Sequence, residues 1–176
     1  MIRNLQIICF SLLIQIFNSC NTTKNVSKEY PRMIGDIAFD EKIDSTEFKL
    51  CNNDSLVVQY YAFTKIVGGK TYLDEKYEVE KIFEKNYNHK IVKKESGNIR
   101  IRFLVNCKGV SGRYRIIGMD KNYKEKHFDT SITNQLLSIT QRLVKWKPFI
   151  KNNIQRDYYQ YLIFKIEKGE LIEILP

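Results

Sequence analysis

The chain has 176 residues, of which 43% are hydrophobic and 28% charged, with 10 Phe and 11 Tyr. That length suits one ordinary domain with a tail, and the composition excludes a wholly disordered chain. Three Pro and eight Gly exclude collagen-like and Pro/Gly-rich low-complexity sequence. Lys and Arg number 29 against 20 Asp and Glu, so the chain is basic, with a formal net charge of +9.

The N-terminus has the pattern of an export signal. Arg3 precedes the mostly apolar stretch 5–17, which is too short to span a bilayer but suits the apolar core of a signal peptide. Small Ser19 then precedes Cys20, and the residues that follow are abruptly polar. The sequence therefore predicts an exported protein.

The run Phe17-Asn18-Ser19-Cys20 resembles the lipobox of bacterial lipoproteins. The resemblance implies a signal peptide over 1–19, a lipid on Cys20 and a tether over 20–36. Two or three acyl chains anchor a domain firmly, at about 0.8 kcal/mol for each buried CH₂. The alternatives are an ordinary secretory signal cut near Ser19 and a short buried helix. No acidic run follows Cys20, so we expect a lipid-anchored protein on the periplasmic side of the outer membrane.

Two cysteines remain once Cys9 leaves with the signal and Cys20 takes a lipid. In an oxidising compartment Cys51 and Cys107 are predicted to form a disulfide. Closing a loop of that length stabilises a fold by about 4 kcal/mol on the chain-entropy model. The alternative is two buried, unpaired thiols. No histidine stands near either cysteine in the sequence, so a catalytic cysteine is not expected.

Residues 37–74 are predicted to be an N-terminal extension with one strand. That strand is expected at 56–63, which is rich in β-branched and aromatic residues, and Gly68-Gly69 marks a turn after it. A helix is predicted at about 75–88, because apolar residues recur there at helical spacing. Its stripe consists of Val79, Ile82, Phe83, Asn86 and Tyr87, and Asp74 is the expected cap.

Period-2 alternation predicts the next strand. Its alternating apolar residues are Ile99, Ile101, Phe103 and Val105. Lys108-Gly109 should then turn the chain into a second strand at 113–119.

A second helix is predicted at about 130–145, capped by Asp129 or Thr130. Its apolar stripe consists of Ile132, Leu136, Ile139 and Leu143, with Leu137 and Val144 beside it. Trp146-Lys147-Pro148 should end this helix, because proline disfavours helix at the preceding residue. We expect Trp146 to lie over the sheet.

The last predicted strand covers 158–166. After it, Lys168-Gly169 either turns the chain back into a strand at 171–175 or bulges one long strand. The order of elements predicts an α+β fold with two layers, an antiparallel sheet of three or four strands and two helices.

The stretch Gly97–Pro148 resembles the C-terminal domain of the TonB family, especially its short-chain versions in Bacteroidetes-type bacteria. The pieces that carry the resemblance are Arg102-Phe103-Leu104-Val105-Asn106 with Gly109, Phe128-Asp129, and Trp146-Lys147-Pro148. With the helix at 75–88 the similarity covers about residues 75–176. It implies a TonB C-terminal-like domain over that range, in which the last strand lies at the sheet edge and pairs with a peptide from an outer-membrane receptor.

The chain also departs from TonB energy transducers. Its apolar stretch ends at Cys20, and its tether is short and poor in proline. We therefore expect a protein-binding module that is linked to outer-membrane transport and does not itself transduce energy. The alternative is a structural envelope lipoprotein that associates with itself and has no transport role.

The candidate partner-binding residues combine aromatic area with positive charge, a pairing that is enriched in binding hot spots. They are Tyr158, Tyr159, Tyr161, Arg100 and Arg102. Arg113 and Arg115 are expected to share a sheet face with Arg100 and Arg102. Such a face suits anionic lipid headgroups, lipopolysaccharide phosphates or an acidic protein, and nucleic acid is not expected as a partner of an exported protein. A solvated sheet face is the alternative.

No pattern for catalysis, cofactor or metal binding stands out. Gly68-Gly69-Lys70-Thr71 resembles the end of a phosphate loop, but position 64 is Thr where that motif needs Gly, so a turn is predicted. His89 and His127 have no carboxylate or thiol at metal-ligand spacing and are expected on the surface. We therefore expect neither an enzyme nor a metal or cofactor.

Overall fold

The computed structural model describes residues 37–52, 58–59 and 75–175. They belong to one compact unit, Asp36–Pro176. The predicted signal peptide, Cys20, the tether over 20–36 and the Gly68-Gly69-Lys70-Thr71 turn lie outside the described residues, as does Asp74. No helix within the described ranges is long and apolar enough to cross a membrane.

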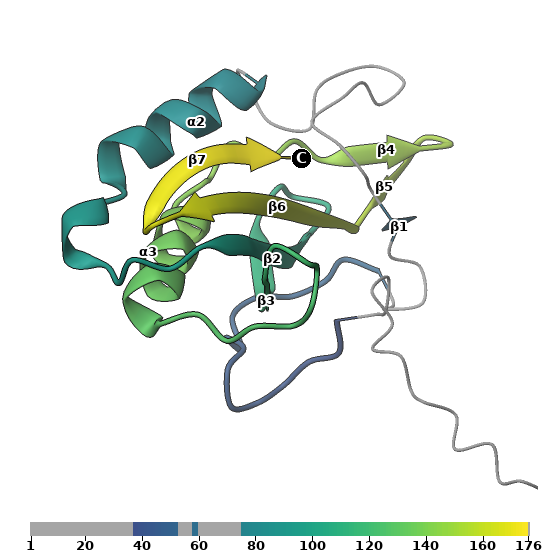
Figure 1. Cartoon of the computed structure of the whole chain (residues 1–176). Helices are drawn as coiled ribbons and strands as arrows, with labels where there is room; N and C mark the ends of the chain where they lie inside the picture. The colour runs from purple at the N-terminus through teal and green to yellow at the C-terminus, as the bar shows by residue number, and fades with distance from the viewer. Residues whose placement is uncertain (1–36, 53–57, 60–74, 176) are drawn as a thin grey trace, which may run out of the picture. The chain divides into compact units, whose positions relative to one another are not determined.

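The fold has two layers, as predicted: two helices pack on one face of a sheet of four antiparallel strands, to which a two-residue strand adds in parallel (Figure 1). The elements of the main sheet are β1 (Val58–Gln59), β2 (Gly97–Val105), β3 (Ser111–Met119), β6 (Tyr158–Glu167) and β7 (Glu170–Leu175). The helices are α2 (Glu75–Asn86), the short 3₁₀ helix η3 (His89–Ile91) and α3 (Thr130–Gln141). A separate small hairpin consists of β4 (Phe149–Lys151) and β5 (Ile154–Arg156).

The core lies between the sheet and the helices. The alternating residues of β2 that face the helices are fully buried there, which confirms the period-2 prediction. From the helices, the core takes Val79 and Phe83 of α2 and Ile132, Leu136 and Ile139 of α3. Asp129 caps α3 by accepting a hydrogen bond from the Ser131 N–H at 2.9 Å, as one of the two predicted caps.

The second helix is shorter than predicted, because its last turn tightens. Arg142 and Leu143 donate their backbone N–H groups three residues back, to Ile139 and Thr140, and the chain leaves the helix after Gln141. Leu143 is still fully buried, but Val144 is 78% exposed, so its assignment to the apolar stripe was wrong.

The hairpin β4–β5 was not predicted from the sequence. Asn152 and Asn153 form its turn, both with positive φ, at 52° and 60°. Asn tolerates this left-handed conformation, and two-residue hairpin turns of this type require it. An Asn-Asn pair between residues 149–151 and 154–156 is the signal that would have predicted the hairpin.

A second tight turn folds β7 back onto β6. Lys168 and Gly169 form it with φ of 52° and 85°, and a Cβ on Gly169 would lie 2.8 Å from the carbonyl oxygen of Lys93. Of the two predicted alternatives at Lys168-Gly169, the structure therefore has the returning strand. β6 pairs with β2 on one side and with β1 and β7 on the other. The expectation that the strand at 158–166 lies at the sheet edge was wrong.

Residues 37–52 form an irregular segment, here called the strap, which packs on the sheet face opposite the helices. Ile37 and Phe48 of the strap are buried against Leu104 and Tyr159 of the sheet. A Cβ at Gly112 would lie 2.3 Å from the Phe48 ring, so a glycine on β3 makes room for that ring. The predicted extension over 37–74 thus contributes its described N-terminal part to the same compact unit as the sheet.

Candidate functional site

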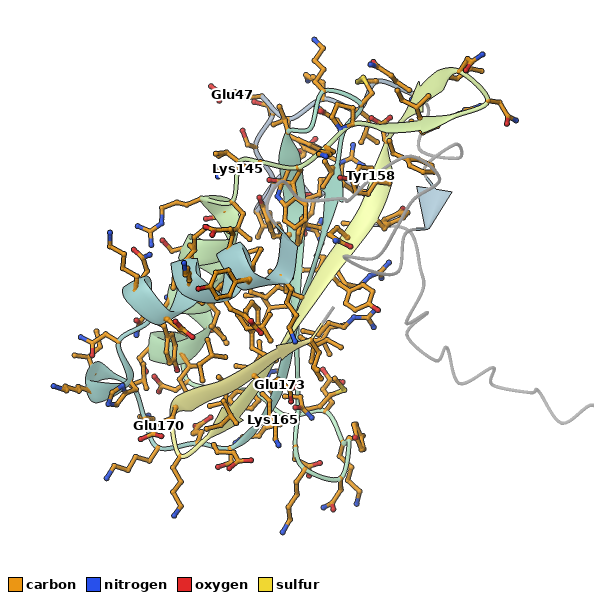
Figure 2. The ribbon with its side chains drawn as sticks, turned by 90° about the horizontal axis from the view of Figure 1, so that it is seen from above. Glu47, Lys145, Tyr158, Lys165, Glu170 and Glu173 are labelled. Atoms are coloured by element: carbon orange, nitrogen blue, oxygen red, sulfur yellow. A yellow bond between two sulfur atoms is a disulfide. The ribbon has the colours of Figure 1, made fainter. Side chains whose placement is uncertain are left out.

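The five predicted partner-binding residues do not form one surface. Tyr158 faces the helix side, where it is fully buried, and its hydroxyl donates to the carbonyl of Lys147 at 2.9 Å. Figure 2 shows Tyr158 near the start of β6. Its neighbour Tyr159 faces the strap side and is also buried, so neither tyrosine is exposed to a partner.

Two cation–π contacts join the remaining members across β2 and β6. The guanidinium of Arg100 lies 4.5 Å from the centroid of the Tyr161 ring, and that of Arg102 lies 5.3 Å from the Tyr159 ring. Arg102 is buried, whereas Arg100 and Tyr161 are partly exposed. These residues stabilise the sheet face, and within the predicted group only Arg100 and Tyr161 are accessible enough to meet a partner.

The two arginines of β3 form hydrogen bonds and an ion pair with the strap. Arg115 forms a bidentate ion pair with Asp44, at 2.6 and 2.8 Å, and also donates to the carbonyl of Ala38 at 2.8 Å. Arg113 donates to the carbonyl of Ile37 at 3.3 Å. The hydrogen bonds from Arg115 hold the pKa of Asp44 below its usual value. The predicted basic face is thus partly covered by residues of the same chain.

A buried carboxylate fixes the other end of the strap. Asp157 is fully buried and accepts backbone N–H bonds from Cys51, at 3.0 and 3.1 Å, Asn52, at 2.7 Å, and Cys107, at 2.9 Å. Cys51 and Cys107 are joined by a disulfide, the pairing that the cysteine count predicts. The sulfur atoms of this pair and the Asp157 carboxylate lie within 4.8 Å of one another, but disulfide sulfurs are not the thiolates that bind metals.

We expect Asp157→Ala to lower the free energy of unfolding by about 3 kcal/mol, because each buried N–H that loses its acceptor costs about 1–3 kcal/mol. Urea unfolding of the oxidised protein measures this loss. Glu47→Ala is the matched control, since Glu47 is exposed on the strap. A loss for Asp157→Ala no larger than that of the control would show that the carboxylate does not hold the strap.

A groove of about 360 Å³ lies between α2 and β7. Its apolar lining consists of Phe83, Leu171, Ile172 and Ile174, and its polar lining of Glu80, Glu84, Tyr87, His89, Glu170 and Glu173. Glu80 pairs with Lys76 at 3.3 Å. Four glutamates therefore line this groove beside its four apolar side chains, in a protein whose net charge is +9.

Tyr87 connects the two walls of this groove. Its hydroxyl donates to the carbonyl of Gly169 at 2.9 Å, which ties the end of α2 to the β6–β7 turn. Burial raises the pKa of Tyr87 to about 12, so the hydroxyl keeps its proton at neutral pH and remains a donor. The groove thus has a fixed width at this end.

β7 is the strand that borders the groove, and among the described residues it pairs with β6 alone. Its other edge therefore presents backbone N–H and C=O groups of the kind that can pair with another strand. Ile172 on this strand is 48% exposed, and Glu170 and Glu173 are exposed as well. Figure 2 shows Glu170 and Glu173 on the β7 ribbon, with Lys165 on the neighbouring strand.

The sequence predicted a binding site on β6 and not on β7, because Lys168-Gly169 was compatible both with a returning strand and with a bulge in one long strand. The two glutamates among the aliphatic residues of 170–175, Glu170 and Glu173, were the available signal, since charged side chains are common on exposed edge strands. His89 and His127 are exposed, as predicted.

In comparisons with known proteins, no family model, curated protein or solved structure gives a significant match to this chain.

Proposed function

We propose that this chain is an exported, lipid-anchored envelope protein whose α+β domain binds an extended segment of a partner protein along β7. The observation that carries the proposal is the outer edge of β7, which pairs with no other strand in the described part of the chain and lies beside the groove between α2 and β7. Strand addition of this kind combines main-chain hydrogen bonds with pockets for alternate side chains. The four glutamates at the groove favour a partner segment that carries Lys or Arg.

Two further features support an envelope location. The described fold contains a disulfide, and disulfides persist in oxidising compartments such as the periplasm. The pattern before Cys20 resembles a lipoprotein signal. The resemblance of residues 75–176 to the TonB C-terminal domain also favours a binding module over an enzyme, but it places the bound peptide on a strand that is internal here. The proposed site is therefore β7.

In-cell photo-crosslinking tests the proposed binding site. A photoreactive residue at position 172 is expected to capture a heterologous envelope protein, whereas one at position 91 is not, since Ile91 is 66% exposed but lies outside the groove. Glu84→Lys with Glu173→Lys should reduce the yield at position 172 by about 10-fold or more, because it reverses the charge that faces the partner. Glu41→Lys with Glu47→Lys makes the same charge change on the strap and should leave the yield unchanged.

Two outcomes of this experiment would contradict the proposal. Capture of a second copy of the chain alone would favour the self-associating structural role. Equal yields at positions 172 and 91 would mean that contact is not specific to β7.

Acylation of Cys20 is tested separately. Cells fed a fatty-acid analogue should label the wild-type protein, and Cys20→Ala should lose the label and leave the salt-washed membrane fraction. An unlabelled wild-type protein would favour an ordinary secretory signal, and would leave the β7 site untouched.

A further inference from the structure

A second surface lies at the end of the sheet where the small hairpin projects (Figure 1). It is formed by the β2–β3 loop, 106–110, and by residues 142–156, here together called the basic end. The two segments are adjacent, because a Cβ on Gly109 would lie 2.3 Å from the carbonyl oxygen of Trp146. The proposed peptide groove uses none of these residues.

The basic end is strongly charged. It contains no Asp or Glu, and its Lys and Arg side chains in the described part of the chain are those of Lys108, Arg142, Lys145, Lys147 and Arg156. The next acid along the chain, Asp157, is buried and already accepts the N–H bonds of both cysteines. Glu47 and Lys49 of the strap border the β2–β3 loop, and their opposite formal charges sum to zero. At the opposite end of the sheet, Lys93 and Lys126 form ion pairs with Asp129 and Glu95.

Exposed aliphatic side chains accompany these charges. Four of the large hydrophobic residues that are exposed in the described part of the chain belong to the basic end: Val110 at 52%, Val144 at 78%, Ile150 at 55% and Ile154 at 49%. Ile150 and Ile154 lie on the two strands of the hairpin. Ile150 pairs with Gln155, and Ile154 pairs with Lys151. Trp146 and Phe149 are buried beneath, so the hairpin is joined firmly to the core.

We infer that the basic end docks on an anionic lipid surface. Lys and Arg attract lipid phosphates, while small aliphatic side chains enter the boundary between headgroups and acyl chains. Ile150 and Ile154 lie on the projecting hairpin, a shape that suits insertion between lipid headgroups (Figure 1). The surface would hold the domain against the membrane in a fixed orientation, and it stands independently of the β7 site and of a lipid on Cys20.

Vesicle flotation of the chain from residue 20 onward, carrying Cys20→Ser and no lipid, tests the inference. The protein should float with vesicles of phosphatidylglycerol and phosphatidylcholine, should not float with pure phosphatidylcholine, and should be released by added salt. Lys108→Glu with Arg142→Glu should weaken binding by at least about 30-fold, since each basic residue near such a surface contributes about 1 kcal/mol and the new carboxylates are repelled. Ile150→Asp with Ile154→Asp should also weaken it.

Matched variants at the opposite end decide whether position or total charge matters. Lys121→Glu with Lys124→Glu makes the same charge change on exposed residues. Ile91→Asp makes one apolar-to-acid change and is compared with Ile150→Asp alone. Both controls should bind nearly as the wild type does. Equal losses for the two charge reversals, or no binding to anionic vesicles, would overturn the inference. Dimerisation that Ile150→Asp abolishes, without vesicle binding, would assign this end to a protein interface instead. Circular dichroism confirms that each variant is folded.

Discussion

Trp146→Ala is expected to lower the free energy of unfolding by about 3–5 kcal/mol, enough to unfold a domain of ordinary stability. Trp146 is 4% exposed, and its ring lies 5.2 Å from that of Phe103 on β2. It therefore packs over the sheet, and its removal leaves a cavity between the sheet and the segment after α3. The backbone here is also closely packed, since Gly109 approaches the Trp146 carbonyl.

Urea unfolding followed by circular dichroism measures this loss. Tyr123→Ala is the control, because Tyr123 is an aromatic residue that is 78% exposed, and its replacement should change stability by less than about 0.5 kcal/mol. If Trp146→Ala does not fold, Trp146→Phe keeps most of the volume and should show a smaller loss. A loss for Trp146→Ala similar to that of the control would contradict its place in the core.

Replacing both cysteines, Cys51→Ser with Cys107→Ser, is expected to cost about 4 kcal/mol on the chain-entropy model, since the bridge joins residues 56 apart in the sequence. The strap should be destabilised before the rest of the fold, because the bridge attaches the end of the strap to the β2–β3 loop. Limited proteolysis should therefore cut the variant within residues 37–50 while the sheet stays intact.

Reduction of the wild-type protein with a dithiol provides an independent version of this experiment. It should give the same loss of stability and the same cleavage sites. Resistance of the strap to proteolysis after reduction would mean that Asp157 and the Arg115–Asp44 ion pair hold it without the bridge.

The regular elements could be predicted because their signals are local. The alternation at 99–105 fixes which face of β2 meets the helices, and the apolar spacing from Val79 to Tyr87 fixes the buried side of α2. The predicted α+β class and its antiparallel sheet follow from the order of such elements.

The strap could not be predicted in the same way, because contacts with distant residues hold it. Asp157 binds the backbone of Cys51 and Asn52 from more than 100 positions away, and nothing near any of these residues in the sequence signals the contact. Of these contacts, the cysteine count predicted the disulfide alone.

The candidate site was placed on the wrong strand for a related reason. Tyr158, Tyr159 and Tyr161 looked like an aromatic binding surface, but alternation along β6 sends Tyr158 to one face and the other two to the opposite face. The burial of Tyr158 and Tyr159 then depends on the hairpin and the strap, neither of which the sequence pattern indicated.

The pairing of β6 with β2 also means that a proline in β6 would disturb the sheet itself. Gln160 and Tyr161 pair with Phe103 and Arg102 of β2, and they lie between the part of β6 that pairs with β1 and the part that pairs with β7. Proline at either position would disturb the centre of the sheet and is a poor test of partner binding. Binding has to be tested on β7.

Amide hydrogen exchange on the complex with the protein captured at position 172 tests the β7 site most directly. Strand addition predicts that amides within β7, Glu170–Leu175, exchange more slowly in the complex, while those of β3, Ser111–Met119, the other edge of the sheet, are unchanged. Protection confined to β3, or none in β7, would contradict the proposal that the partner pairs with β7.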